Sequence, residues 1–589
     1  GERAAVAAGM GPPHHRAAVK PGAGGSAGGR RNLRMALLLL LPAAALLLFV
    51  FYLPVGTALL EGFREGPDSS AYSLRRFLSL LTDPYILRLL RFTAWQAFLS
   101  AALSVVIGLP LGYLLANRSF PGKSLVASLV MVPFVMPSIT VALGFLIMYG
   151  TNGWFNGVLE SLFGFKVRVL NTLWAIVLAH AFYNGPLVAR MTQGAWERLD
   201  PALEESARTL GAAPFAVWRD VTLPAIAPGV LSGTVLAFIY CFMSFPIVLS
   251  LGGARFSTLE VEIFTSMRVL LDFETAAALA AIQAAVSLVF AYVFLRLEGR
   301  APALFASTRA RRPRPLGGKA GDAWIWVLLA ALLVFFGGPM ASIVADSLHD
   351  PRGGVSLAAY ERIVTAGHNF HLGAPPLRTI QNSLRFAAIA AVIALVAGTC
   401  FVYATVRFIG RRLPLLETLS LAPIAVSSVA LAYGLSVAFR GPLSLVPQDL
   451  RIPLVHGVLA FPFVVRAFRP VLEGVDARLI EAARTLGAGR WRAFVDVELP
   501  MAVTGLLVAF ALCFGLSVSE TTATLMLARP EQVTMPVSVY RFLAARDFPS
   551  ASAMAVLLMA VTGGVFLLGE LLAALLRRQR GGRAVARNA

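Results

Sequence analysis

Two polar segments of this chain repeat one another within a sequence that otherwise consists largely of apolar runs. Residues 200–224 read DPALEESARTLGAAPFAVWRDVTLP, and residues 476–500 read DARLIEAARTLGAGRWRAFVDVELP. A single offset of 276 residues aligns the two segments without a gap. The same offset aligns three further pairs: His180 with His456, Pro186 with Pro462, and Arg190 with Arg466. A match of this length indicates that the chain is a duplication of one unit.

The composition indicates that both units cross a membrane several times. Of the 589 residues, 57% are hydrophobic and 14% are charged, and the mean hydropathy is +0.74. These values are typical of a polytopic membrane protein. The net charge of +20 could suggest a nucleic-acid partner. The Lys and Arg residues, however, lie in loops and tails between the apolar runs. This placement favours a role in membrane orientation, so no nucleic acid is expected as a partner.

The apolar runs predict an all-α fold with about 12 transmembrane helices, arranged as two tandem six-helix domains. We expect one domain at residues 35–297 and the other at residues 323–577. The expected spans are 35–60, 88–116, 124–150, 169–192, 225–252 and 276–297, then 323–347, 380–407, 413–440, 452–472, 501–527 and 550–576. Residues 1–34 are expected to form a disordered tail, residues 298–322 a basic linker and residues 578–589 a second tail.

Two features of the spans leave alternatives open. The first run could be a cleaved signal peptide, but it is long enough to span and no clear cleavage site follows it. The stretch around Pro133 matches that around Pro423, with an offset of 290. Prolines there would kink or unwind a spanning helix, either to line a cavity or only to pack on a neighbour.

Basic residues predict which side of the membrane each loop faces. They cluster after the second span, in the linker, after the eighth span and after the last span: Arg118, Lys123, Arg309, Arg311, Arg312, Arg314, Lys319, Arg407, Arg411, Arg412, Arg577, Arg578 and Arg580. All of these fall on one side of the membrane if the N-terminus is cytoplasmic. Both repeated polar segments and the C-terminus then lie on the cytoplasmic side as well.

Each polar segment is expected to form a short helix, a turn and a second short helix outside the bilayer. Asp200 and Asp476 suit the N-cap of the first helix, and Gly211 and Gly487 stand where it would end. Two pairs of residues have a spacing of three and can form ion pairs along the helix: Glu205 with Arg208, and Glu481 with Arg484. The small residues would let another surface approach closely: Ala207, Gly211, Ala483 and Gly487.

This pattern, E-A-A-x-x-x-G followed thirteen residues later by L-P, resembles the EAA loop of binding-protein-dependent ABC transporter permeases. The second copy has Glu481, Ala482, Ala483 and Gly487 in full, whereas the first has Ser206 in place of the middle Ala. The resemblance implies that residues 196–224 and 473–500 are coupling loops that dock into a groove on cytoplasmic ATPases. The alternative is a pair of ordinary surface helices. The residues assigned to coupling are Asp200, Glu205, Ala207, Arg208, Gly211, Pro224, Asp476, Glu481, Ala483, Arg484, Gly487 and Pro500.

The resemblance to type I permeases extends over nearly the whole chain after residue 35. Fused two-domain members of this kind include thiamine and ferric iron permeases, and four stretches of the first half are similar to the thiamine permease: 91–105, 149–154, 178–190 and 241–264. The resemblance implies an ATP-driven importer in a bacterial inner membrane. Its partners would be two cytoplasmic ATPase subunits and a periplasmic or lipid-anchored substrate-binding protein. Thiamine and ferric iron both remain open as substrates.

The sequence offers no catalytic site. The stretch FPGKS at 120–124 is the nearest approach to a phosphate loop, but Asn117 stands where that motif needs Gly. No metal cluster and no nucleophile–base arrangement stands out, and Cys241, Cys400 and Cys513 lie in apolar segments without metal spacing. We therefore expect no cofactor and no enzyme activity in this chain, with ATP used by the partner subunits.

A few polar residues stand in or beside predicted spans. Glu520 lies within a span, where ionisable groups are costly, so it either lines the translocation pathway or is a structural carboxylate paired with a neighbour. His180 and His456 are expected to form hydrogen bonds between helices. Four acidic residues fall in a predicted external loop, either solvated or docking a partner: Glu260, Glu262, Asp272 and Glu274. The rival function is a secondary transporter or channel with parallel repeats.

Overall fold

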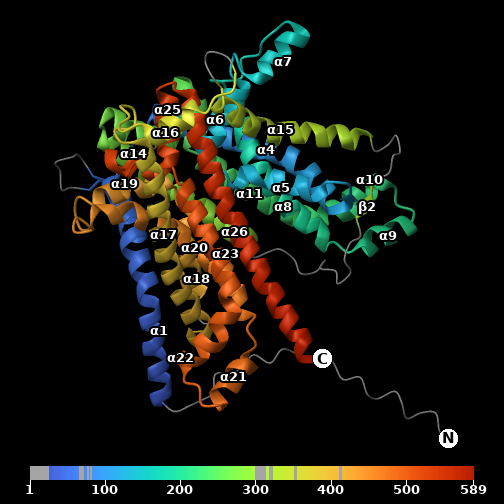
Figure 1. Ribbon diagram of the computed structural model, residues 1–589, viewed down its shortest axis with the longest axis vertical. Coiled ribbons are helices and arrows are strands. Elements are labelled where there is room, and N and C mark those ends of the chain that lie inside the picture. Colours follow the sequence, from blue (N-terminus) through green and yellow to red (C-terminus); the bar gives the residue numbers. More distant parts are fainter. Residues whose placement is uncertain are drawn as a thin grey trace.

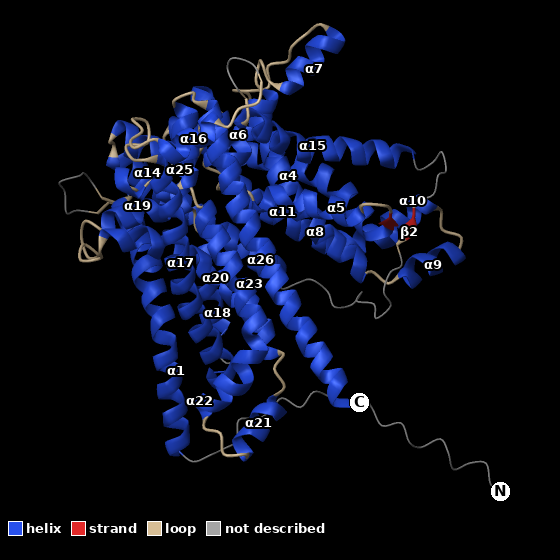
Figure 2. Cartoon of the chain, viewed as in Figure 1, coloured by secondary structure: helices blue, strands red, loops and turns tan. Residues whose placement is uncertain are grey.

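The computed structural model describes residues 26–64, 72–73, 75, 78–79, 82–298, 313–316, 323–349, 354–409 and 414–588. Most of the expected tail at 1–34, most of the expected linker at 298–322, and Arg411 and Arg412 lie outside these residues. The described chain is almost entirely helical, which confirms the all-α prediction (Figure 2). The strands found in it are β1 (Arg118–Ser119) and β2 (Arg314–Pro315), which pair in parallel.

The helices of the first half follow the repeated pattern of long and short elements. They are α1 (Ser26–Leu47), η1 (Leu48–Tyr52), α2 (Leu53–Glu61), α4 (Pro84–Asn117), α5 (Lys123–Val135), α6 (Ser138–Tyr149), α7 (Trp154–Phe163), α8 (Leu173–Arg198), α9 (Pro201–Thr209), α10 (Pro214–Val217), η2 (Trp218–Thr222), α11 (Leu223–Phe242), α12 (Pro246–Leu251), η3 (Gly253–Arg255), α13 (Leu259–Thr265), η4 (Ser266–Leu270) and α14 (Phe273–Glu298).

The second half repeats this order. Its helices are α15 (Ala323–Ser347), α16 (Ala358–Thr365), α17 (Pro376–Ala404), η7 (Thr405–Ile409), α18 (Pro414–Leu421), η9 (Ala422–Ala425), α19 (Ser428–Ala438), α20 (Gln448–Glu473), α21 (Ala477–Thr485), α22 (Arg490–Ala493), η10 (Phe494–Glu498), α23 (Leu499–Ser519), α24 (Thr522–Leu527), η11 (Pro530–Gln532), α25 (Met535–Ala544) and α26 (Phe548–Asn588).

The membrane-spanning character that the sequence predicts is present in these helices. Within the described residues, nine helices are long and apolar enough to cross a membrane, and up to eleven if two sharply bent pairs each count as one span. The bent pairs are α5 with α6–α7, and α18–η9 with α19, so the prolines near 133 and 423 do break spans. The remaining predicted span is α8, whose mean hydropathy is lowered by buried polar residues such as His180 and Asn184.

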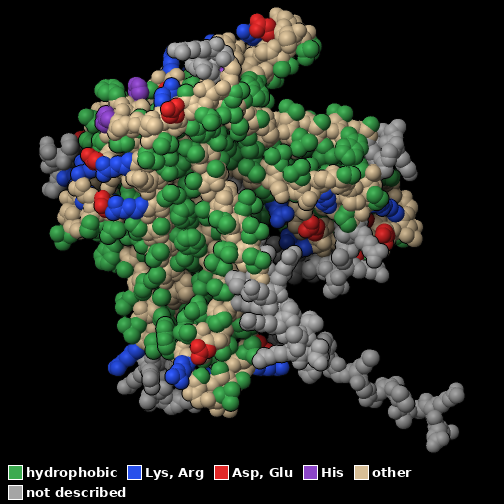
Figure 3. All heavy atoms as spheres, viewed as in Figure 1, with side chains coloured by type: hydrophobic (Ala, Val, Ile, Leu, Met, Phe, Trp, Pro, Cys, Tyr) green, Lys and Arg blue, Asp and Glu red, His purple; other side chains and the backbone are tan. Residues whose placement is uncertain are grey.

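The long helices form two arms that are joined at one end and diverge toward the other (Figure 1). One arm contains α17, α20 and α23 and ends at α21, and the other contains α4, α8 and α11 and ends at α9. Hydrophobic side chains cover the middle of the first of these arms, with charged side chains at its two ends (Figure 3). This distribution is the one expected of helices that cross a lipid bilayer.

The first helices of the two halves are exchanged. Helix α1 packs on α17, and α2 packs on α19, although both precede the first half's other helices in sequence. In the same way α15 packs on α5 and α6 of the first half, as well as on α26 of its own. The two halves are therefore locked together by their own first spans, and the joined end of the molecule is a shared core.

The duplication is visible in individual contacts. A Cβ at Gly108 would lie 2.7 Å from Val188 Cβ, and one at Gly398 would lie 2.6 Å from Val464 Cγ1. In both halves the missing side chain lets two long helices approach closely, α4 with α8 and α17 with α20. A hydrogen bond from a backbone N–H to a side-chain hydroxyl is repeated as well: Leu259 N donates to Thr93 Oγ1 at 3.1 Å, and Met535 N donates to Ser383 Oγ at 2.8 Å.

The structure corrects the expectation of solvation for Glu260, one of the four acidic residues after the fifth span. The segment forms α13, and Glu260 on it is only 1% exposed. Its Oε1 accepts a hydrogen bond from Gln283 Nε2 at 3.2 Å. This hydrogen bond helps to satisfy the buried carboxyl. Sequence position alone gave no sign that this loop folds back into the bundle.

Candidate functional site

The two repeated polar segments take the same conformation at the ends of the two arms. Asp200 Oδ1 accepts a hydrogen bond from Ala202 N at 3.0 Å at the start of α9. Asp476 Oδ1 accepts one from Arg478 N at 2.9 Å at the start of α21. Both predicted N-caps are confirmed. Each carboxylate satisfies a backbone N–H that the helix cannot, and its charge suits the positive end of the helix dipole.

Glycine ends both helices with a left-handed residue. The φ angle is +86° at Gly211 and +89° at Gly487, a region that residues with a Cβ enter only at a cost. The chain then closes each turn through a backbone hydrogen bond of 3.0 Å, from Ala212 N to Ala207 O and from Ala488 N to Ala483 O. The turn therefore has the same shape in both copies.

Large apolar side chains point away from the protein at the tip of each turn. Leu210 is 87% exposed and Leu486 is 89% exposed, at matching positions of the repeat. The second short helix adds an exposed aromatic in each copy, Phe215 and Trp491. A single exposed leucine needs no explanation, but two matched pairs of exposed apolar groups at two matched tips point to a contact surface.

The ion pairs that the spacing along these helices allows are not formed in the described structure. Among the described residues, no salt bridge joins Glu205 to Arg208 or Glu481 to Arg484. All four side chains belong to exposed residues, where pairing gains little free energy in water. Their charges are therefore available to a partner.

Behind each tip, a different interaction anchors the loop to the spanning helices. In the second half, Arg407 Nε donates to Glu498 Oε2 at 3.0 Å, and Arg407 Nη2 donates to Leu472 O at 3.1 Å. The ion pair joins η7, which follows α17, to η10, and the second hydrogen bond joins η7 to the end of α20. In the first half, Thr222 Oγ1 donates to Glu204 Oε1 at 2.8 Å and joins η2 to α9. Sequence reasoning missed both anchors, although the repeat alignment contains their residues.

Glu520 lies at a break between α23 and α24. Its carboxylate accepts hydrogen bonds from Ala523 N at 2.8 Å and from Thr524 N at 3.0 Å, so it caps α24. Thr524 Oγ1 donates to Oε2 at 3.0 Å, and His456 Nε2 lies 3.3 Å from the same oxygen. The carboxylate is thus held by donors of this chain at the helix break.

The two matched histidines form hydrogen bonds between helices, as predicted. His180 Nδ1 on α8 lies 3.0 Å from Ser100 Oγ on α4, and His456 Nδ1 on α20 lies 2.7 Å from Ser517 Oγ on α23. Within the described residues there is no group of three or more His, Cys, Asp or Glu side chains that could hold a metal ion. The arrangement offers docking surfaces and buried polar contacts between helices.

Comparisons with known proteins agree with this geometry. The profile of the binding-protein-dependent transport system inner membrane component matches residues 108–301 and 413–581, one segment in each half. The thiamine transport system permease protein ThiP of Brucella abortus (strain 2308) is 27% identical over 462 residues, which cover 77% of this chain and 82% of that protein.

Two further relatives differ in how much of this chain they cover. The thiamine transport system permease protein ThiP of Escherichia coli (strain K12) is 26% identical over 475 residues, 79% of this chain and 85% of that protein. The sulfate transport system permease protein CysT of Salmonella typhimurium is 29% identical over 234 residues, which cover 39% of this chain and 83% of that protein. With one matched segment in each half, the chain belongs to the family of binding-protein-dependent transport system inner membrane components, as a fused, two-domain ABC permease.

Proposed function

We propose that this chain is the complete membrane pore of an ATP-driven thiamine importer. Thiamine permeases are similar to it over more than three quarters of its length, across both halves. The sulfate permease match covers 39% of the chain, and ferric iron, the other substrate suggested by the sequence, has no support among these relatives. The chain would pass thiamine from an external binding protein across the bacterial inner membrane.

Two separate ATPase subunits would supply the energy by docking on α9 and α21. The observation that carries this proposal is the pair of matched tips, each with an exposed leucine, Leu210 and Leu486, beside a glycine with positive φ. Two equal sites at the ends of two diverging arms fit two copies of one ATPase. The residues of the coupling loops named from the sequence lie on or beside these tips, and this chain itself would hydrolyse no ATP.

The docking side would be the cytoplasmic side. Helix α1 begins at the same end of the molecule as α21, and the C-terminal end of α26 also points that way (Figure 1). The basic residues that follow spanning helices support this orientation. With residues 35–297 and 323–577 as the two domains, closure of the ATPases would draw α9 and α21 together and rock the arms about their joined end.

Glu520 would act in transport through the helix break that it caps. The break stands where α23 passes into α24, and its carboxylate is 11% exposed. A spanning helix that is interrupted at a charged residue is typical of a segment that lines a pathway. We place Glu520 at the edge of the pathway on this ground, with His456 as one of the groups that hold its carboxylate.

Reconstitution tests the whole proposal. This chain would be placed in liposomes with the ATPase and the binding protein encoded beside it, and ATP hydrolysis would be measured with thiamine, ferric iron or sulfate. We expect thiamine, delivered by the binding protein, to stimulate hydrolysis and the other two to leave it at the basal rate. Stimulation by another substrate would refute the thiamine assignment. Failure of the ATPase to bind this chain would refute the docking sites and favour a secondary transporter.

A further inference from the structure

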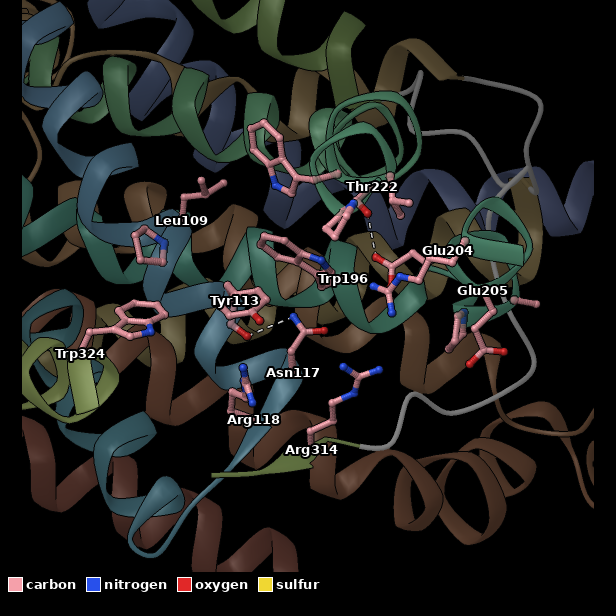
Figure 4. Close-up of a pocket in the computed structure, with 17 residues that line it drawn as sticks. Leu109, Tyr113, Asn117, Arg118, Trp196, Glu204, Glu205, Thr222, Arg314 and Trp324 are labelled. Carbon is pink, nitrogen blue, oxygen red and sulfur yellow. Dashed lines mark hydrogen bonds between the residues drawn. The ribbon is translucent and has the colours of Figure 1, made fainter. Parts of the chain in front are cut away.

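A cavity of about 1130 Å³ lies behind α9, where this helix meets the ends of α4 and α8 (Figure 4). The residues that line it are apolar and aromatic at one end and charged at the other. Toward the spanning helices it is formed by Leu109, Pro110 and Tyr113 of α4 together with tryptophans, and toward the loop it is formed by charged groups. From Leu109 to the end of α4 at Asn117 the helix rises about 12 Å. The cavity therefore reaches from the bilayer-spanning part of the arm to the surface outside it.

The charged end is rich in guanidinium groups. Arg118, Arg208 and Arg314 line it, against the carboxylates of Glu204 and Glu205. Arg118 on β1 stands opposite Arg314 on β2 in the register of the paired strands, and Figure 4 shows the two on either side of Asn117. An anion between two opposed guanidinium groups would be stabilised by charge-assisted hydrogen bonds from both.

One residue of the cavity wall holds an unsatisfied acceptor. Asn117 is 8% exposed, and its Nδ2 donates to Tyr113 O at 3.1 Å. Its Oδ1 is buried without a hydrogen-bond partner and lies on the side of the amide opposite that hydrogen bond (Figure 4). A buried carbonyl oxygen without a donor costs free energy, so a ligand that offers a hydroxyl group would be stabilised here.

The duplication shows how the lining of this cavity differs from the matching positions of the second half. The offset of 290 that aligns Gly108 with Gly398 also aligns Asn117 with Arg407, and the offset of 276 aligns Thr222 with Glu498. In the second half these two positions form the buried Arg407–Glu498 ion pair. In the first half they are two shorter, neutral side chains that line the cavity.

We propose that this cavity binds an anionic phospholipid of the leaflet on the α9 side of the membrane. Its phosphate would lie between Arg118, Arg208 and Arg314, and a headgroup hydroxyl would donate to Asn117 Oδ1. A free anion would use the charged end alone, whereas a lipid also uses the apolar wall that runs up α4. Tryptophans at the level of the headgroups and basic pockets between helix ends are typical of such sites, and Trp196, Trp218 and Trp324 line this one.

Native mass spectrometry of the delipidated permease alone tests this site, independently of any ATPase or transport substrate. Phosphatidylglycerol, which is anionic and carries headgroup hydroxyls, would be titrated against phosphatidylethanolamine and inorganic phosphate. We expect one tightly held phosphatidylglycerol per chain. Arg314→Gln should weaken its binding about tenfold, the effect of losing one charge-assisted hydrogen bond. The nearly isosteric Asn117→Asp, which places a negative charge beside the phosphate, should weaken it at least as much.

Arg478→Gln is the matched control, because Arg478 is an arginine of the other loop that does not line the cavity. It should bind phosphatidylglycerol like the parent. Equal binding by the parent, Arg314→Gln and Asn117→Asp would overturn the proposal. Equal retention of phosphatidylethanolamine would overturn the headgroup assignment, and displacement of the lipid by millimolar phosphate would show a site for a soluble anion instead.

Discussion

Arg407 and Glu498 form an ion pair of 3.0 Å in which the carboxylate is 3% exposed and the guanidinium is 21% exposed. The pair ties the end of a spanning helix to the segment that leads out of the second docking loop. Arg407 also donates to Leu472 O at 3.1 Å, so one side chain holds three elements together. Movement of this loop and movement of the arm are therefore mechanically connected.

Arg407→Met should destabilise the protein by leaving Glu498 buried without its partner. Removal of one member of a fully buried pair costs about 3–5 kcal/mol, and the partial exposure of Arg407 lowers our expectation to about 2–3 kcal/mol. Thermal unfolding in detergent measures this. Arg385→Gln is the control, because its pair with Asp449 is exposed on both sides and should be worth less than about 1 kcal/mol. Equal effects of the two substitutions would contradict the anchoring role.

The exposed leucines at the two tips should be needed for ATPase binding and for little else. Leu486→Ser removes an apolar side chain from a residue that is 89% exposed, so the unfolding temperature of the variant should stay within about 1 °C of the parent. Co-purification of the ATPase should fall about tenfold, as expected for the loss of a buried leucine from an interface. Leu445→Ser, at an equally exposed leucine outside the loops, serves as control. Undiminished co-purification with Leu486→Ser would speak against docking on α21.

Gly487 should be required for the shape of the turn. No atom lies within 4 Å of a Cβ built there, so the obstacle to a side chain is the φ of +89°. Gly487→Val should cost about 1–2 kcal/mol in the turn and uncouple ATP hydrolysis from uptake. Gly489→Val nearby also meets no atom and has no positive φ, so it should keep coupling. Normal uptake by the Gly487 variant would remove this turn from the coupling mechanism.

Much of this architecture could be predicted from the sequence, and the failures share a physical cause. The span expected at 323–347 coincides with α15, and that at 452–472 with α20, because an apolar run of that length has few alternatives in a bilayer. Residue spacing likewise predicts the two N-caps and the duplication. Glu260 was misplaced, since hydropathy cannot tell a loop in water from one that folds back against neighbouring helices.

The exchange of first helices and the anchors behind the loops also escaped prediction. Both depend on which helices become neighbours, and a pattern within one helix carries no information about its neighbour. Arg407 was counted from the sequence as a basic residue that sets orientation, yet it pairs with Glu498, 91 residues further along the chain. An alignment of the two repeats would have pointed to this pair, because Arg407 and Glu498 are both replaced in the first half, by Asn117 and Thr222.

Close helix packing should depend on the matched glycines of the spanning helices. A Cβ at Gly398 would lie 2.6 Å from Val464 Cγ1, so Gly398→Ala must push α17 away from α20. We expect a loss of about 1–3 kcal/mol, the usual cost of overpacking a dense core. Gly337→Ala, in the middle of spanning helix α15, meets no atom within 4 Å and should leave the unfolding temperature unchanged.

Substitutions at Glu520 and Thr524 distinguish a structural role of the Glu520 carboxylate from a role in transport. Its oxygens are held by two backbone N–H groups, Thr524 Oγ1 and His456, so Glu520→Gln loses acceptor capacity at a helix break. We expect about 1–2 kcal/mol of destabilisation from this loss. Thermal unfolding and thiamine uptake at matched expression would be measured together, with Thr524→Val as the control that removes one donor and keeps the charge.

The two roles predict different relations between the loss of stability and the loss of thiamine uptake in these variants. With Glu520 at the edge of the pathway, Glu520→Gln should reduce uptake by at least tenfold, while Thr524→Val loses stability and keeps most of its uptake. Because the neutral amide keeps the size and shape of the carboxylate, such a difference isolates the charge at the break. Normal uptake by Glu520→Gln at normal expression would remove Glu520 from the pathway and leave it as the cap of α24 alone.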